Sequence, residues 1–480
     1  MNTDEGALKP SGPDELRRLL WAWLEAARAY VSSKGAVSLE QRPYWVEIDE
    51  NRQRREDRRT YNLLPKTAFE LVELPEWHLF ESALLADKAG SRLNKLLRTG
   101  RNGMTLRPVD IAGRFLRPLL SENGPGQAVV TQPDRELFNA LFNDFLTFLT
   151  ADSVASTECA YLVGATLPEV HAPLLLGPNL SLEIVSNDEL LDLLQRGPFT
   201  NEEFFNRAYY AGRGRCLRLR YNFDLPIHVD TPTDQYIEPK EFVISQEHLD
   251  GVRSAFAILW HGSIGVVAKT STFGNLFHFF GESLVYDPYR SLLSSAETLD
   301  LSGERLSAFV SNFAIAKRVA REDGGFDLPL RYLLDATQKT DLRERLIDIA
   351  IAAESMLIGG GTDELGYRFA SRGALLLSNE VAERVALFET LRAAYNARSK
   401  IVHGTHVEPN AKFKVRAGHK MELGDLTREF EQHCREIFRR LAATVPLAKP
   451  TEEMWRRLEL GGTLSTPPIE ETVSFSATRD

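Results

Sequence analysis

The chain has 480 residues, a formal net charge of −10 at pH 7 and a sequence pI near 5.6. This length exceeds what one ordinary hydrophobic core accommodates, so two or three domains are expected. An acidic chain creates no global positive field that would attract nucleic acid, and any contact with RNA must therefore be local.

The cysteine content and the hydropathy of the chain indicate the cellular compartment in which the protein is expected. The three cysteines, Cys159, Cys216 and Cys434, are odd in number and far apart. They fit a reducing compartment and suit neither a disulfide framework nor a zinc site. We find no secretory signal at the start of the chain and no apolar run long enough to cross a membrane. These features predict a cytoplasmic protein without membrane contact, metal or cofactor.

The N-terminal part of the chain mixes helix and strand signals. Residues 1–13 contain two glycines and two prolines and are predicted to be a flexible leader. We expect a mixed α/β region over residues 14–150. In it, residues 44–48 alternate as in a strand, and residues 136–149 carry apolar side chains at helical spacing.

A basic run lies within this region. Residues 51–61, NRQRREDRRTY, hold five arginines and end in a tyrosine. Guanidinium groups pair with phosphate and aromatic rings stack on bases, so such a run could contact RNA. Because Glu56 and Asp57 interrupt the positive charge, we expect a solvated loop or helix face instead.

Short strands dominate the next region, residues 151–301, which is predicted to be an α+β domain. Strands are expected at 174–178 and 180–184 around a turn, with a short helix after Ser186. Residues 216–221 alternate cleanly, which predicts a strand with its arginines on the outer face.

The C-terminal part is helical by its periodicity. Apolar residues recur at helical spacing through residues 302–448, with long helices expected near 342–357, 379–403 and 426–445. The Ser-, Thr- and Pro-rich residues 461–480 are predicted to be a disordered tail. The predicted fold is an α+β N-terminal portion followed by an all-α C-terminal helical bundle.

The most informative stretch is residues 390–406, TLRAAYNARSKIVHGTH. Its polar residues at i, i+4, i+7 and i+11 fall on one helix face, namely Arg392, Asn396, Ser399 and His403. At about 100° per residue, Arg398 and His403 point about 140° apart. One helix therefore does not bring this pair together, but a second copy of the helix could complete the site.

Residues 395–404 of this stretch resemble the signature of HEPN domains, specifically the ApeA-like group of bacterial defence proteins. The family motif is an arginine, usually followed by a polar residue, with a histidine four to six positions after the arginine, here Arg398, Ser399 and His403. Residues 346–355 and 364–370 resemble the family's two preceding helices, and the resemblance covers about residues 302–448.

The resemblance implies a HEPN-like helical domain, commonly dimeric, that cuts RNA without a metal in antiphage defence by abortive infection. Its implied partners are RNA, with tRNA among the candidates, a second copy of the chain bound through the helical domain, and a phage-derived trigger. The portion before residue 302 is then expected to sense a signal or regulate the nuclease.

The chemistry of such a nuclease suits the two motif residues. A base must activate the ribose 2′-hydroxyl and an acid must protonate the departing 5′-oxygen, and histidine does both because its ordinary pKa is about 6.5. Arginine stays charged and donates paired hydrogen bonds to phosphate. His403 and Arg398 are therefore the predicted catalytic residues.

Four neighbours are predicted to support the site or bind RNA. Ser399 and Asn396 could orient the imidazole or contact phosphate. Lys400 and Arg392 would add positive charge, although exposed helix residues are the simpler explanation for both.

Other interpretations stay open. His403 precedes Gly404 and also fits a helix C-cap without a chemical role. The domain could bind RNA or nucleotide without cutting, or the bundle could be a dimerisation module. His406 lies three residues after His403, but no third ligand has suitable spacing, so no zinc site is predicted. For His261 and His278, structural roles are expected.

Overall fold

The computed structural model describes most of the chain. The described residues are 12–34, 37–49, 52–63, 70–87, 115–116, 134–151, 153–195, 212–226, 240–273, 283–286, 298–322, 324–358, 364–416, 419–444 and 447–461. The predicted leader (1–13) and the predicted disordered tail (461–480) lie almost entirely outside these residues, as does His278.

Three N-terminal helices form one hydrophobic core, α1 (Pro13–Lys34), α3 (Pro75–Ala86) and α6 (Arg135–Thr150). Aromatic rings fill it: Trp23 lies 4.8 Å from Trp77 between ring centroids, and the Trp23 indole N–H donates to a backbone carbonyl. The helix expected at 136–149 is confirmed as α6.

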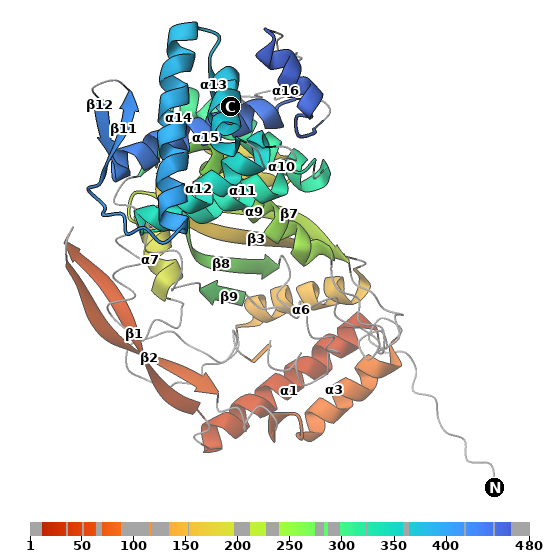
Figure 1. The fold of residues 1–480 in the computed structure, drawn as a ribbon. Coiled ribbons are helices and arrows are strands. Elements are labelled where there is room, and N and C mark those ends of the chain that lie inside the picture. Colours follow the sequence, from red (N-terminus) through yellow and green to blue (C-terminus); the bar gives the residue numbers. More distant parts are fainter. Residues whose placement is uncertain are drawn as a thin grey trace.

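A two-stranded antiparallel hairpin follows α1, formed by β1 (Val37–Asp49) and β2 (Arg52–Leu63), at the lower left in Figure 1. The strand expected at 44–48 is confirmed within β1. The prediction of a loop or helix face for the basic run 51–61 is wrong, because nearly all of that run forms β2. Strand β2 pairs with β1 along its whole length, and the backbone hydrogen bonds of this pairing stabilise the strand. The pattern of charges in residues 51–61 does not predict that pairing.

A six-stranded antiparallel sheet occupies the middle of the molecule, in the order β5-β6-β7-β3-β8-β9. Its strands are β3 (Ser153–Val163), β5 (Leu174–Gly177), β6 (Leu180–Ile184), β7 (Cys216–Pro226), β8 (Gly265–Phe273) and β9 (Ser283–Tyr286). The strands expected at 174–178, 180–184 and 216–221 are confirmed. Two short strands, β4 (Ala165–Thr166) and β10 (Leu299–Asp300), pair in parallel beside it.

The helix expected after Ser186 is also confirmed, as α7 (Asn187–Gln195). Its start is a capping box: the Glu189 amide donates to Ser186 Oγ at 3.1 Å, and the Ser186 amide donates to the Glu189 carboxylate at 3.1 Å. The serine and the glutamate thus satisfy each other's backbone donors and set the position at which the helix begins.

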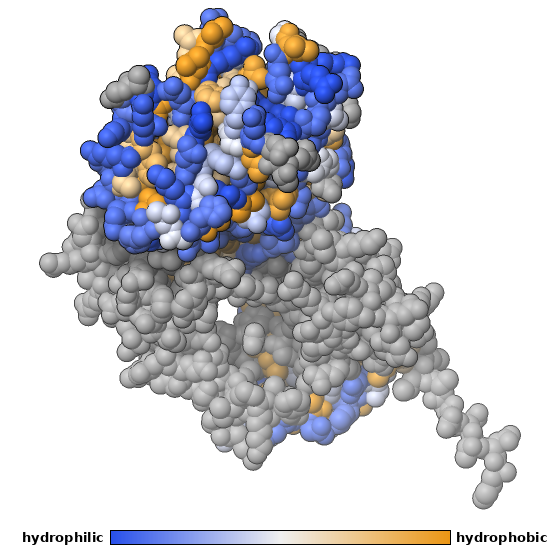
Figure 2. All heavy atoms as spheres, in the orientation of Figure 1, coloured by the Kyte–Doolittle hydropathy of each residue, from blue (hydrophilic) through white to orange (hydrophobic). Residues whose placement is uncertain are grey.

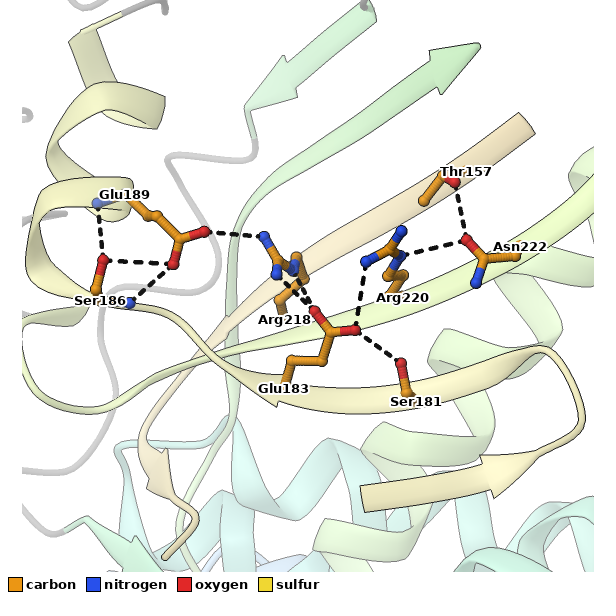
Figure 3. A network of polar contacts seen from close by, with 8 residues as sticks. All are labelled: Thr157, Ser181, Glu183, Ser186, Glu189, Arg218, Arg220 and Asn222. Atoms are coloured by element: carbon orange, nitrogen blue, oxygen red, sulfur yellow. Dashed lines mark hydrogen bonds and ion pairs between the residues drawn. The ribbon is translucent and has the colours of Figure 1, made fainter. Parts of the chain in front are cut away.

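The two faces of the central sheet differ in character. One face packs with α9 (Lys240–Leu259) through a core that includes Leu217, Leu219 and Phe256. The other face carries an ion-pair network across β6, β7 and α7, drawn in Figure 3. In it Arg218 makes two hydrogen bonds to Glu183, at 2.8 and 2.5 Å. The arginines of this strand therefore lie on the face away from α9, as expected.

The C-terminal part is a bundle of helices, which lies above the sheet in Figure 1. They are α10 (Glu304–Glu322), α11 (Asp327–Thr337), α12 (Leu342–Leu357), α13 (Leu365–Leu377), α14 (Val381–Val402), α15 (Leu423–Ala442) and α16 (Glu452–Glu459). The long helices expected near 342–357, 379–403 and 426–445 are confirmed. None of the helices in the described parts of the chain is long and apolar enough to cross a membrane.

The expectation that this part is all-α is wrong at one place. A β-hairpin, β11 (Lys412–Arg416) and β12 (His419–Glu422), lies between α14 and α15. In β11 the side chains of Phe413 and Val415 are buried in the bundle core, while the intervening basic residues are exposed. The period-2 alternation of a half-buried strand was thus present in the sequence.

Helix α10 belongs to two cores. Its first half contributes Leu306, Phe309 and Phe313 to the core shared by the sheet and α9, whereas its second half contributes Ile315 and Val319 to the bundle core. The predicted domain boundary at residues 301/302 immediately precedes this helix. Because one continuous helix enters both cores, it fixes the bundle relative to the sheet.

A buried ionic cluster joins the same two parts. The Glu431 carboxylate on α15, only 1% exposed, accepts hydrogen bonds from Arg345 at 3.0 and 2.8 Å and a further one from Arg435. Each arginine also donates to a backbone carbonyl, Arg435 to Ala257 in the last turn of α9 at 2.6 Å and Arg345 to His261 in the loop that follows α9. Burial lowers the pKa of Arg435, and the Glu431 carboxylate opposes that shift.

We therefore expect Glu431→Ala to lower the free energy of unfolding by about 3–5 kcal/mol, since it leaves Arg345 and Arg435 without their shared carboxylate in a buried site. The control is Glu436→Ala on the same helix, where a partly exposed carboxylate pairs with Arg440 and should contribute less than about 1 kcal/mol. Urea unfolding curves measure both. Equal effects of the two substitutions would contradict the central role of Glu431.

Candidate functional site

Helix α14 ends in a Schellman motif at the predicted histidine. The Gly404 amide donates to the Ile401 carbonyl at 3.1 Å, and the Thr405 amide donates to the Lys400 carbonyl at 2.9 Å. Gly404 has φ +81°, a left-handed conformation that glycine adopts without strain. His403 is thus the C-cap residue, as the alternative interpretation expected, and its side chain is exposed.

Arg398 lies on a different side of α14 and faces α12. Its Nη2 donates to the Glu354 carboxylate at 3.1 Å, and the two side chains are 21% and 23% exposed. Its Nε is buried without a hydrogen-bond partner. One ion pair therefore anchors the guanidinium group and leaves its Nη1 donors unused by the described residues.

Within one copy of the chain, no hydrogen bond joins Arg398 to His403. The two residues are five positions apart, about 7.5 Å along the helix axis, and their side chains leave α14 in different directions. Arg398 is turned toward the bundle interior and His403 toward solvent.

The four predicted supporting residues are on or near the exposed face of α14. Arg392 and Asn396 are exposed, and the Arg392 guanidinium lies 5.9 Å from the centre of the Phe388 ring. Ser399 is partly buried, and the Lys400 ammonium lies 5.7 Å from the Phe413 ring of β11. Arg392, Asn396, Ser399 and His403 follow one line along the helix, so the structure retains the predicted polar stripe.

Two histidines outside the motif, His406 and His261, have hydrogen-bond partners elsewhere in the structure. His406 Nε2 lies 2.7 Å from the Glu408 carboxylate on the exposed loop after α14. The His261 backbone carbonyl accepts a hydrogen bond from Arg345. Across the described parts of the chain, no three His, Cys, Asp or Glu side chains are placed to hold a metal ion.

Glu354, the ion-pair partner of Arg398, was not among the site residues predicted from the sequence. Burial raises the pKa of its carboxyl group, and the positive charge of Arg398 opposes the shift. Burial and the nearby Glu354 charge also raise the pKa of Tyr395, one helical turn before Arg398. The available signal was a carboxylate within a mostly apolar run of α12, IDIAIAAESML, in which Asp348 is the other acidic residue.

Comparison of the chain with models of protein families, with curated proteins and with solved structures finds no match in any of the three.

The raised pKa of Glu354 predicts a pH dependence of stability. The folded state retains the Glu354 proton above the usual pKa of 4.5, where the unfolded chain has already lost it. Its contribution to stability is therefore largest below pH 4.5 and falls as the pH rises through the folded-state pKa. The difference in unfolding free energy between the wild type and Glu354→Gln should decrease with rising pH over this window.

Urea unfolding at a series of pH values from 4 upward measures this difference, and the exposed Glu453→Gln variant controls for the loss of one carboxylate. A difference that increases with pH would show that pairing with Arg398 outweighs burial at Glu354.

Proposed function

We propose that this chain is a metal-independent endoribonuclease of a bacterial antiphage system, with its active centre at the C-terminal end of α14. The observation that carries the proposal is that one helix presents both an exposed imidazole at its C-cap and, five residues earlier, an arginine anchored by an ion pair. That pair lies in the run whose sequence resembles the ApeA-like HEPN signature.

The proposed reaction uses the substrate's own nucleophile. The ribose 2′-hydroxyl attacks the adjacent phosphorus while a histidine accepts its proton, and the 5′-oxygen leaves as it receives a proton. Arg398 donates hydrogen bonds to the phosphate oxygens, on which negative charge increases in the transition state. The products are a 2′,3′-cyclic phosphate and a 5′-hydroxyl end.

Glu354 has a positioning role in this proposal. Its carboxylate holds Arg398 Nη2, so the guanidinium group is fixed in orientation before RNA binds. The unused Nη1 donors are then available for a phosphate oxygen. Removing Glu354 should therefore weaken cleavage without removing the proton-transfer group.

A second copy of the chain would complete the centre. One imidazole cannot act as base and acid in the same step, and the His403 of another copy supplies the second group. An exposed apolar surface continues the polar stripe of α14 toward its start: Val381 is 73% exposed, Val385 is 56% exposed, and Tyr367 on α13 is 56% exposed. Figure 2 shows apolar surface at this tip of the bundle. We propose that two copies pair along α14.

A non-catalytic role is the second candidate. The Arg398–Glu354 ion pair ties α14 to α12 and would stabilise the bundle in a protein that only binds RNA or nucleotide, or that uses the bundle to dimerise. Activity measurements on variants of His403 separate this role from catalysis.

For catalysis, we expect His403→Ala to reduce the rate of RNA cleavage by about 10²–10⁴-fold, the usual range for loss of a positioned proton-transfer group. Arg398→Lys should also reduce the rate, because an ammonium group cannot reproduce the paired donors of the guanidinium group. Purified protein is incubated with total cellular RNA in the presence of EDTA, and the cut ends are mapped. His406→Ala, which removes a nearby exposed histidine, is the matched control and should cleave normally.

The chemical groups at the cut RNA ends distinguish metal-independent cleavage from cleavage by a metal-activated water. Cyclic phosphate or 3′-phosphate ends that form in EDTA support the roles of His403 and Arg398. A requirement for magnesium together with 3′-hydroxyl ends would mean that a metal activates water, and those roles would be wrong.

For assembly, we expect a dimer at micromolar concentration that the double variant Val381→Glu/Val385→Glu converts to a monomer, since two carboxylates would be buried in the contact. Light scattering measures the mass, and cleavage should fall with the loss of the dimer. Val170→Glu, which changes a more exposed valine on the sheet portion, is the control. A monomeric wild type with full ribonuclease activity would refute pairing along α14.

A further inference from the structure

A cleft of about 640 Å³ lies where the sheet portion meets the helical bundle. Its walls come from α9, from the α9–β8 loop with His261 and Gly262, from β8, from the end of α11 and from the start of α12. The volume falls in the range of small-molecule sites. None of these residues belongs to the centre proposed on α14.

The charges that line this cleft are mostly positive. Four cationic side chains line it, from two helices, one strand and the loop between α11 and α12, namely Arg253, Lys269, Lys339 and Arg345. Asp335 is the one carboxylate among the lining residues. Positive side chains that converge from separate elements favour an anionic ligand.

Two of these cations have little compensating charge. Lys269 Nζ donates to the neutral side chain of Gln246 at 2.7 Å and has no carboxylate partner among the described residues. Arg253 reaches Asp250 at only 4.0 Å, the limit of an ion pair, and its Nε is buried without a hydrogen-bond partner. These two side chains therefore carry the excess positive charge of the cleft.

The other two cations already have partners. Lys339 lies 3.4 Å from the Glu344 carboxylate, and Arg345 is held in the buried cluster with Glu431. They shape the cleft and contribute to its potential, but the Glu344 carboxylate offsets the charge of Lys339, and the Arg345 guanidinium group already donates to Glu431 and to the His261 carbonyl. A ligand anion is therefore expected nearest to Arg253 and Lys269.

The rest of the lining suits an organic molecule better than a bare ion. The lining includes hydroxyl and amide side chains from Ser263, Thr337, Gln338 and Thr340 and apolar side chains from Leu249, Ile264 and Leu334. Such a mixture provides hydrogen bonds and an apolar wall in addition to charge. A phosphate group linked to a sugar or an aromatic ring would use the positive charge, the hydrogen-bonding groups and the apolar wall together.

We propose that this cleft binds a small phosphorylated ligand of nucleotide size, with its phosphates between Arg253 and Lys269. The ligand would contact α9 and β8 on one side and α11 and α12 on the other, so it would stabilise the docking of the bundle onto the sheet portion. This site is independent of RNA cleavage at α14 and uses none of its residues.

Isothermal titration calorimetry on the full chain tests the proposal with ATP, inorganic tripolyphosphate and adenosine as three separate probes. We expect saturable binding of ATP, weaker binding of tripolyphosphate and the weakest binding of adenosine. The double variant Arg253→Ala/Lys269→Ala should weaken ATP binding at least about 10-fold, while Arg331→Ala, an exposed arginine on α11 that does not line the cleft, should change it less than about twofold.

Circular dichroism melting curves establish that the variants are folded. If the double variant does not fold, the single substitution Lys269→Gln removes one positive charge from the cleft with a smaller change in side-chain size. His403→Ala should bind ATP like the wild type, which separates this site from the ribonuclease proposal. The proposal is overturned if the wild type does not bind ATP saturably or if the double variant binds it equally well. It is also overturned if adenosine alone accounts for the affinity, or if a short single-stranded RNA, and not ATP, depends on Arg253 and Lys269.

Discussion

The placement of one buried carboxylate, Glu431, constrains much of this structure. It accepts hydrogen bonds from Arg345 on α12 and Arg435 on α15, and the two arginines also donate to carbonyl groups in the last turn of α9 and in the loop that follows it. The buried Arg435 and Glu431 and the mostly buried Arg345 are tolerated away from water only with this complete set of partners. The cluster therefore sets α12, α15 and α9 in one arrangement and couples the bundle to the sheet portion.

Helix α12 connects this cluster to the candidate centre. Arg345 lies near its start, and Glu354 follows nine residues later, about 13.5 Å along the helix axis. The same rigid helix thus lines the basic cleft at one end and anchors Arg398 of α14 further along. Any shift of α12 relative to α14 would change the orientation of that arginine.

Close packing around α14 supports this geometry. A Cβ atom added to Gly373 on α13 would lie 2.6 Å from the Leu391 side chain, and one added to Gly366 would lie 3.1 Å from the Tyr395 ring. Glycine at these two positions lets α13 approach α14 closely, so the buried face of α14 is held against α13 as well as α12. The opposite face, with the polar stripe and His403, is left at the surface.

Local patterns in the sequence were sufficient for α6, α7, α12, α14 and α15 and for several strands, because side-chain periodicity and caps such as the Ser186/Glu189 box act within a few residues. The separation of Arg398 and His403 onto two faces of α14 also followed from helical geometry alone. Strand β2 was missed because its partner, not its own charge pattern, makes it a strand. The Arg398–Glu354 pair joins residues 44 positions apart, and the basic cleft draws its walls from α9, β8, α11 and α12. Only the tertiary structure decided these features, since distant side chains become neighbours only when the helices pack.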